Sequence, residues 1–270
     1  MTGLKARRTF GITLLLLVAA GYFWLDYALK TSFQLAAQIS GYLLFGLCLF
    51  LTFFNARKKL PFIPLLRAST WMQIHIYVGY FVMFLGCLHA GFRLPTGGLE
   101  ITVAVLFALV SLSGVVGLIL TRVLPARLTV HGENLVFERI PGMRSKLRDE
   151  VENLVVKSAE TTESSTIADF YRQNLADYFG QPMHCGSHLF GSAKPLHHML
   201  EQIASLGRYL DENERQVMDE LSDHVRAKNN LDFQWYAQGT LKVWLFIHIP
   251  LTFALLLFAA THGILATKFT

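Results

Sequence analysis

Residues 71–92 (WMQIHIYVGYFVMFLGCLHAGF) and residues 244–266 (WLFIHIPLTFALLLFAATHGILA) decide the fold of this chain. Each segment is mostly apolar and has the length, about 20 residues, that an α-helix needs to span the hydrocarbon core of a bilayer. Each segment also contains two histidines. Because polar side chains inside a membrane span are costly, the segments are predicted to be membrane helices whose histidines have a function.

Three more apolar runs of similar length occur in the 270 residues, so the sequence predicts five spans, at roughly 10–29, 35–55, 71–92, 101–121 and 241–265. The composition agrees, because 53% hydrophobic and only 16% charged residues exclude an ordinary soluble domain. We therefore expect an all-α fold with a five-helix transmembrane bundle. Transmembrane helices 1–4 lie in residues 1–121, and transmembrane helix 5 lies with the C-terminus in residues 241–270.

The basic residues next to the helix ends predict the orientation of the chain, because Lys and Arg collect on the cytoplasmic side. One side has only Lys30, Arg93 and Lys268. The opposite side has ten, namely Lys5, Arg7, Arg8, Arg57, Lys58, Lys59, Arg67, Arg122, Arg127 and Lys242. The N-terminus is therefore expected in the cytoplasm of a multi-pass protein. This basic charge faces membrane lipid, and no nucleic acid is expected as a partner.

Residues 122–240 interrupt the membrane pattern and are expected to form a mostly helical cytoplasmic insert. The insert begins with RLTVHGENLVFERI (127–140), in which two β-rich runs around residues 131–134 predict a short β-hairpin. Helices are predicted at 141–160, 167–179 and 195–210, the last with proline in its first turn. A final helix begins near residue 213 and can continue into the fifth span.

The four membrane histidines have the same spacing in both helices, since His75 and His89 are 14 residues apart and so are His248 and His262. Fourteen residues turn a helix to about 40° short of four full turns and advance it by about 21 Å. Each pair therefore lies on one helix face, with one histidine near each side of the membrane. This geometry predicts two haem b groups, each with its iron held by one imidazole from each helix, and such ligation favours electron transfer over oxygen binding.

Other residues in and after the third span fit this hypothesis. Gly79 and Gly86 leave room for a flat macrocycle, although both are also ordinary residues for helix packing. Arg93, one turn after His89, can pair with the propionates of the outer haem. Lys242, Arg67 or Arg122 can do the same for the inner one.

The insert has a weaker signal in the sequence HCGSH (184–188) followed by His197 and His198. Three or four such ligands can bind zinc. The alternative, a polar loop with surface histidines, is favoured because no paired C-x-x-C occurs.

The two histidine-bearing helices resemble those of the ferric-reductase-like transmembrane domain, which ferric reductases, NADPH oxidases and a bacterial haem-binding methionine sulfoxide reductase subunit share. The resemblance covers the spans and depends mainly on spacing and helix order. It implies that His75 and His89 match the ligands of the family's third helix, and His248 and His262 those of its fifth. It also implies electron transfer from the cytoplasmic side to an external acceptor across a bacterial inner (plasma) membrane.

The sequence departs from the family in its long insert and in having no G-x-G-x-x-G fingerprint after a strand. We therefore expect separate redox partners: a cytoplasmic flavoprotein, an iron-sulfur donor or quinol on one side, and a periplasmic cytochrome c on the other. The chain is then an electron-transfer subunit of an oxidoreductase. Two alternatives stay open, a quinol- or quinone-reactive cytochrome b subunit of a respiratory complex, and a transporter or sensor with histidine proton relays.

Overall fold

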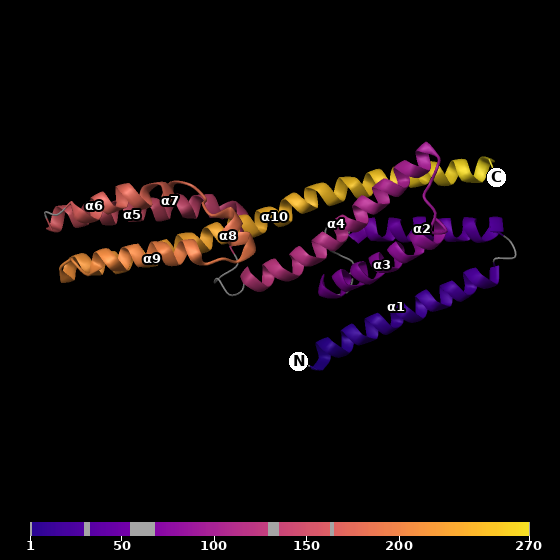
Figure 1. Cartoon of the computed structure of the whole chain (residues 1–270), viewed down its shortest axis with the longest axis horizontal. Coiled ribbons are helices and arrows are strands. Elements are labelled where there is room, and N and C mark those ends of the chain that lie inside the picture. Colours follow the sequence, from indigo (N-terminus) through magenta and orange to yellow (C-terminus); the bar gives the residue numbers. More distant parts are fainter. Residues whose placement is uncertain (1, 30–32, 55–67, 129–134, 163–164, 270) are drawn as a thin grey trace, which may run out of the picture. The chain divides into compact units, whose positions relative to one another are not determined.

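A computed structural model describes residues 2–29, 33–54, 68–128, 135–162 and 165–269. All regular structure in these residues is helical and none is strand, which confirms the all-α class (Figure 1). The helices are α1 (Thr2–Leu29), α2 (Phe33–Thr52), α3 (Ala68–His89), α4 (Gly98–Leu128), η2 (Phe137–Arg139), α5 (Ile140–Thr162), α6 (Thr166–Phe170), η3 (Tyr171–Leu175), α7 (Ala176–Gly180), α8 (Cys185–Phe190), α9 (Lys194–Gly207) and α10 (Glu212–Phe269).

Three of the described helices are long and apolar enough to cross a membrane, namely Ser69–His89 in α3, Gly98–Leu124 in α4 and Glu212–Lys268 in α10. Their large apolar side chains are largely exposed, as at Leu112 and Phe246, which suits contact with lipid chains. Helices α1 and α2 contain the shorter apolar stretches Gly11–Trp24 and Ala37–Thr52. That α1 and α2 also span the membrane stays a prediction.

The chain divides into two compact units, and α10 contributes to both. The first unit comprises Met1–Ile119 and Trp244–Thr270, and the second comprises Leu120–Val243. The second unit covers nearly the same residues as the predicted insert, 122–240.

In the first unit, α3 packs against α1 and α2, and α2 supplies the largest share of that contact. Helices α4 and α10 meet where the indole Nε1 of Trp244 donates a hydrogen bond of 2.9 Å to the backbone oxygen of Ser113. A Cβ atom at Gly117 would overlap the Trp244 ring. Glycine is therefore required at this crossing, because it lets the two helices approach closely.

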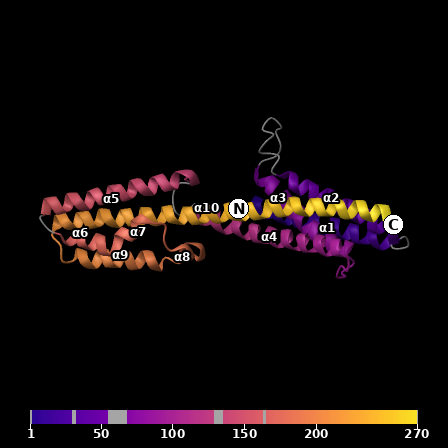
Figure 2. The same cartoon turned by 90° about the horizontal axis from the view of Figure 1, so that it is seen from above.

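The second unit is a helical bundle around one apolar core (Figure 2). Amphipathic spacing on α5 buries Leu147, Val151 and Val155 on one face, as period 3.6 requires. The face of α10 that meets them buries Met218, Leu221, Val225 and Leu231, and the short helices and α9 complete the core. The structure confirms the three helices predicted in the insert. The first, at 141–160, is α5, and the third, at 195–210, is α9. The second, at 167–179, comprises α6, the π-helical turn η3 and α7.

The predicted β-hairpin at 127–140 is wrong for the part that the structure describes; residues 129–134 lie outside it. Leu135 and Val136 form no strand and lead into the 3-10 turn η2. The physical reason is that α10 supplies the hydrogen bonds that a strand partner would supply. The amide of Leu135 donates to Gln234 Oε1 at 3.0 Å, and Gln238 Nε2 donates to the Leu135 oxygen at 2.9 Å. Phe137 then stacks on Trp235, with ring centroids 4.5 Å apart.

A buried ion pair joins α10 to the segment after α7. Lys228 and Asp232 are 1% and 0% exposed and form a salt bridge one helical turn apart. Lys228 Nζ also donates to the Gln181 oxygen at 2.7 Å, and Asp232 Oδ2 accepts from the Met183 amide at 3.1 Å. Burial lowers the pKa of Lys228, and the charge of Asp232 opposes that shift. The pair therefore fixes the otherwise irregular segment 181–183 against α10.

Replacing Lys228 with Met should destabilise the second unit by about 3–5 kcal/mol, because it leaves the Asp232 carboxylate buried without its counter-charge. Thermal unfolding followed by circular dichroism would measure the loss. Lys242→Met is the matched control, because it breaks the exposed pair Lys242–Glu138 and should change little. Equal effects of the two substitutions would contradict the role assigned to the buried pair.

Replacing Gly117 with Ala should destabilise the first unit by about 1–3 kcal/mol, as overpacking does, because the new methyl group meets the Trp244 ring. Gly114→Ala is the control in the same helix, since a Cβ there meets only His248 Cε1, at 4.0 Å. Thermal unfolding in detergent should separate the two variants. A Gly117→Ala protein as stable as Gly114→Ala would show that Trp244 does not hold this crossing.

Candidate functional site

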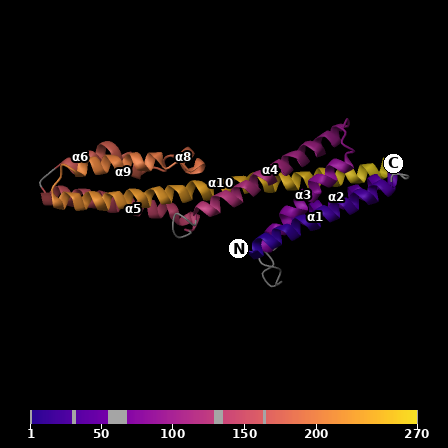
Figure 3. The same ribbon diagram turned by 60° about the horizontal axis from the view of Figure 1, so that its bottom comes forward.

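The four predicted ligand histidines lie in the first unit, two on α3 and two on α10. All four side chains are partly buried. Within this unit, α3 and the C-terminal part of α10 run in the same direction (Figure 1 and Figure 3). His75 lies near enough to His248, and His89 near enough to His262, for a charge on one imidazole to act on the other. The structure therefore brings the histidines together in two pairs, each with one member from each helix.

His89 is held by α2. Its Nδ1 lies 2.8 Å from the hydroxyl oxygen of Ser40, a residue that is 4% exposed. The next residue, Gly41, lies against the same ring, because a Cβ there would be 3.1 Å from His89 Cε1. A side chain at position 41 would press on the imidazole, so the Ser40–Gly41 dipeptide provides both a polar contact and space for the ring.

His248 is held in the same way by α4. Its Nδ1 lies 3.1 Å from the hydroxyl oxygen of Ser113, and the ring stacks on Trp244 with centroids 5.3 Å apart. Gly114, the residue after Ser113, faces His248 Cε1 at ordinary contact distance. Trp244 in turn is fixed by its bond to the Ser113 backbone. One turn of α4 thus determines the orientation of both aromatic side chains.

The other member of each pair has no serine partner in the described residues. His75 packs against Phe54, with ring centroids 4.8 Å apart, and its Nδ1 is buried without a hydrogen bond. A buried polar atom without a partner is rare in native proteins. His262 is partly buried near the other end of α10.

Ser40 and Ser113 are site residues that the sequence analysis missed. Both lie in apolar helices, where a lone serine is an unremarkable packing residue. A signal was nevertheless present, because the dipeptide Ser-Gly occurs twice in the sequence and each copy contacts a predicted ligand histidine.

The two glycines of α3 differ in their surroundings. A Cβ at Gly79 would meet nothing within 4 Å, so this position leaves open space beside the helix. At Gly86 the same atom would lie 2.5 Å from the ring of Phe107 on α4. Gly86 therefore serves helix packing, the alternative that the sequence left open, whereas Gly79 adjoins open space.

Helix α3 ends directly after the second histidine. The chain turns through the left-handed residues Gly91 (φ 60°) and Phe92 (φ 56°), and the Phe92 amide donates to the Cys87 oxygen at 3.1 Å. Arg93 follows on the exposed side of this turn and forms no ion pair within the described part of the chain. Its charge is available to an anion near His89. Lys242, by contrast, is engaged with Glu138 at 2.5 Å.

The histidine-rich segment of the insert does not assemble a metal site. No three His, Cys, Asp or Glu side chains converge among the described residues. His184 and Cys185 begin the short helix α8, His188 is buried with its ring 5.8 Å from that of Tyr236, and His197 and His198 are exposed on α9. The zinc hypothesis for HCGSH is therefore not supported.

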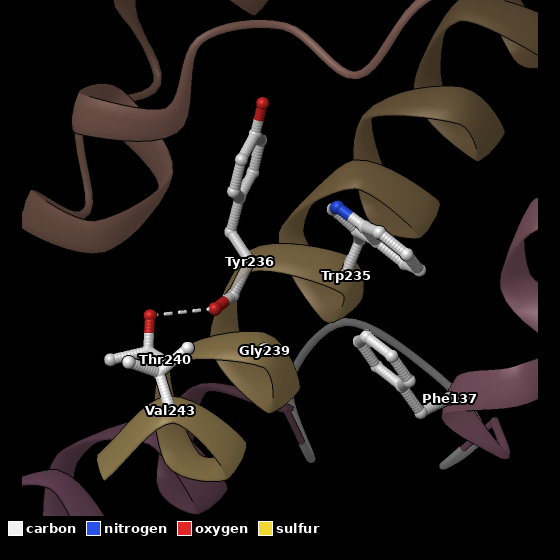
Figure 4. Close-up of a pocket in the computed structure, with 6 residues that line it drawn as sticks. All are labelled: Phe137, Trp235, Tyr236, Gly239, Thr240 and Val243. Carbon is white, nitrogen blue, oxygen red and sulfur yellow. Dashed lines mark hydrogen bonds between the residues drawn. The ribbon is translucent and has the colours of Figure 1, made fainter. Parts of the chain in front are cut away.

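One pocket of about 280 Å³ lies in the second unit (Figure 4). Its polar groups are largely satisfied by the chain itself, because Thr240 Oγ1 donates to the Tyr236 oxygen and the Tyr236 hydroxyl donates to the Pro182 oxygen. The remaining wall is aromatic or apolar. It is lined by Phe137, Trp235, Tyr236, Gly239, Thr240 and Val243.

The chemistry available to this site is that of paired imidazoles in an apolar layer. Two imidazoles that approach from opposite helices can fill both axial positions of a haem iron. Comparisons with models of known protein families, with curated proteins and with solved structures find no match to this chain. The resemblance of α3 and α10 to the ferric-reductase-like domain therefore stays a prediction from the histidine spacing.

Proposed function

We propose that the chain is a membrane di-haem b-type cytochrome that carries electrons across the bilayer between a cytoplasmic-side donor and a periplasmic acceptor. The observation that carries this proposal is the pairing of His75 with His248 and of His89 with His262 across α3 and α10. A packed or hydrogen-bonded core histidine would explain one such residue. Two matched pairs on two parallel helices are better explained by two equivalent ligands, each of which needs two axial donors.

The residues around the pairs fit a haem. Among the described residues, α3 packs mainly on α1 and α2. Gly79 leaves open space on α3, as a position beside a flat group requires.

In this proposal, His75 and His248 hold the inner haem, and His89 and His262 hold the outer one. Haem held by two imidazoles would supply reversible one-electron chemistry, which such ligation favours over oxygen binding. The apolar side chains of α3 and α10 keep water away from the imidazoles. The free cation of Arg93 is suited to neutralise propionates at the outer end, while Gly86 and Phe107 keep α3 and α4 in contact.

The five-helix bundle completes the proposal, with α1 and α2 as the first two spans. Because basic residues near the helix ends are concentrated on one side, we place the N-terminus and the insert in the cytoplasm. The donor, a flavoprotein, an iron-sulfur protein or quinol, then approaches that side. A cytochrome c is the proposed acceptor at the periplasmic side, where Arg93 lies.

The purified protein should contain two non-covalent haem b groups per chain, because the two histidine-bearing helices each contribute one histidine to each of two pairs. A pyridine haemochrome assay would give the number, and a reduced-minus-oxidised spectrum would give the type. His89→Ala and His262→Ala should each lose the same haem. His75→Ala and His248→Ala should both lose the other one, since they remove partners of a single pair.

His188→Ala is the control for these variants, because that histidine lies in the second unit and should keep both haems. A protein without a Soret band would overturn the proposal and favour a non-redox role. If His89→Ala matched His248→Ala in its spectrum, the pairing would be wrong although haem binding would stand.

Protease added to right-side-out vesicles should leave residues 122–240 intact, because the basic residues place the insert in the cytoplasm. The same protease should cleave the insert in inside-out vesicles, which serve as the control. Cleavage in the right-side-out preparation alone would mean that the topology, and with it the direction of electron transfer, is inverted.

A further inference from the structure

Two serine hydroxyls in the first unit contact ring nitrogens of the proposed haem ligands. Ser40 on α2 lies 2.8 Å from His89 Nδ1, and Ser113 on α4 lies 3.1 Å from His248 Nδ1. These two histidines belong to different pairs, so each pair has one imidazole that a serine holds. In both contacts the nitrogen is Nδ1, which leaves Nε2 free of the serine.

The two contacts of Ser40 can form together only when Nδ1 of His89 carries the proton. A serine hydroxyl has one hydrogen, and Ser40 donates it to the backbone oxygen of Ala37 at 2.9 Å. The Ser40 oxygen can then only accept from His89, so Nδ1 carries the N–H. The lone pair of the neutral ring is consequently on Nε2, the nitrogen available to a metal.

Ser113 makes a similar contact with a ring nitrogen from another helix. Gly41 and Gly114, the residues after the two serines, each lie beside Cε1 of the held ring. The main-chain oxygen of Ser113 also fixes Trp244, which stacks on His248. The ring of His248 is thus restrained at its edge and at its face.

We infer that Ser40 and Ser113 are positioning residues that hold one axial imidazole of each haem in the Nδ1–H tautomer and so present Nε2 to the iron. This inference rests on the proposed function. A hydrogen bond from the far nitrogen of a ligand histidine orients the ring and makes it a stronger donor to the metal. A stronger donor stabilises ferric iron, so each serine should lower the reduction potential of one haem and leave that of the other unchanged.

The test compares Ser→Ala, Ser→Cys and Ser→Thr at positions 40 and 113 in the full-length protein. Ser40→Ala should shift only the haem that His89→Ala abolishes to a more positive potential, and Ser113→Ala only the haem of His248. Retention of the affected haem should fall about 10- to 100-fold, as for other residues that support metal ligands. Thr keeps the hydroxyl and should restore the potential, whereas Cys keeps the size but is a weak acceptor and should not.

Ser111→Ala is the matched control, since it makes the same change two residues away in α4 and should move neither potential. Unchanged potentials in both Ser→Ala variants, or Cys variants that behave as wild type, would overturn the inference. A loss of both haems together would also overturn it, because it would indicate a general packing defect.

A second measurement separates this inference from the proposed function. In haem-free full-length protein, ¹⁵N chemical shifts should show His89 as the Nδ1–H tautomer, and Ser40→Ala should release it to the other tautomer. That result would stand even if the wild-type protein bound no haem. If His89 has its proton on Nε2 in the haem-free protein, Ser40 does not set the tautomer and the inference fails.

Discussion

The structure of the first unit depends on the cost of placing imidazoles in an apolar layer. A polar group without a hydrogen bond in such surroundings loses several kcal/mol relative to water. The chain meets this cost locally: Ser40 satisfies His89, and Ser113 satisfies His248. His75 Nδ1 is buried without a hydrogen bond among the described residues. The positions of α2 and α4 beside the histidine helices follow from the same requirement.

The second unit solves a different problem, because its helices are partly polar and its core must form in water. Apolar faces of α5, α9 and α10 make one continuous core, and the buried charges of Lys228 and Asp232 neutralise each other within it. Helix α10 belongs to both units, and its character changes accordingly. It buries an amphipathic face before Val243 and exposes apolar residues such as Phe246 after it.

The helices of the insert and the candidate spans in α3, α4 and α10 could be predicted from the sequence because they depend on local periodicity and apolar length. The β-hairpin failed because Gln234 and Gln238, about 100 residues away, supply the hydrogen bonds of Leu135. Ser40 and Ser113 were missed for the same reason: their role exists only once α2 and α4 lie beside the histidines. The histidine spacing was informative because the same spacing occurs in two helices. A single serine in an apolar helix carries no such information.

In each histidine pair only one ring contacts a serine, and this difference bears on how the proposed haem would be inserted. Ser40 orients His89 and Ser113 orients His248, whereas His75 Nδ1 forms no hydrogen bond among the described residues. If the chain binds haem as proposed, the imidazole that a serine orients would bind the iron first, and the other imidazole of the pair would bind it in a second step. The chain itself would then set the order of haem ligation. In the intermediate, the iron would be bound on one face only, by the histidine that a serine orients.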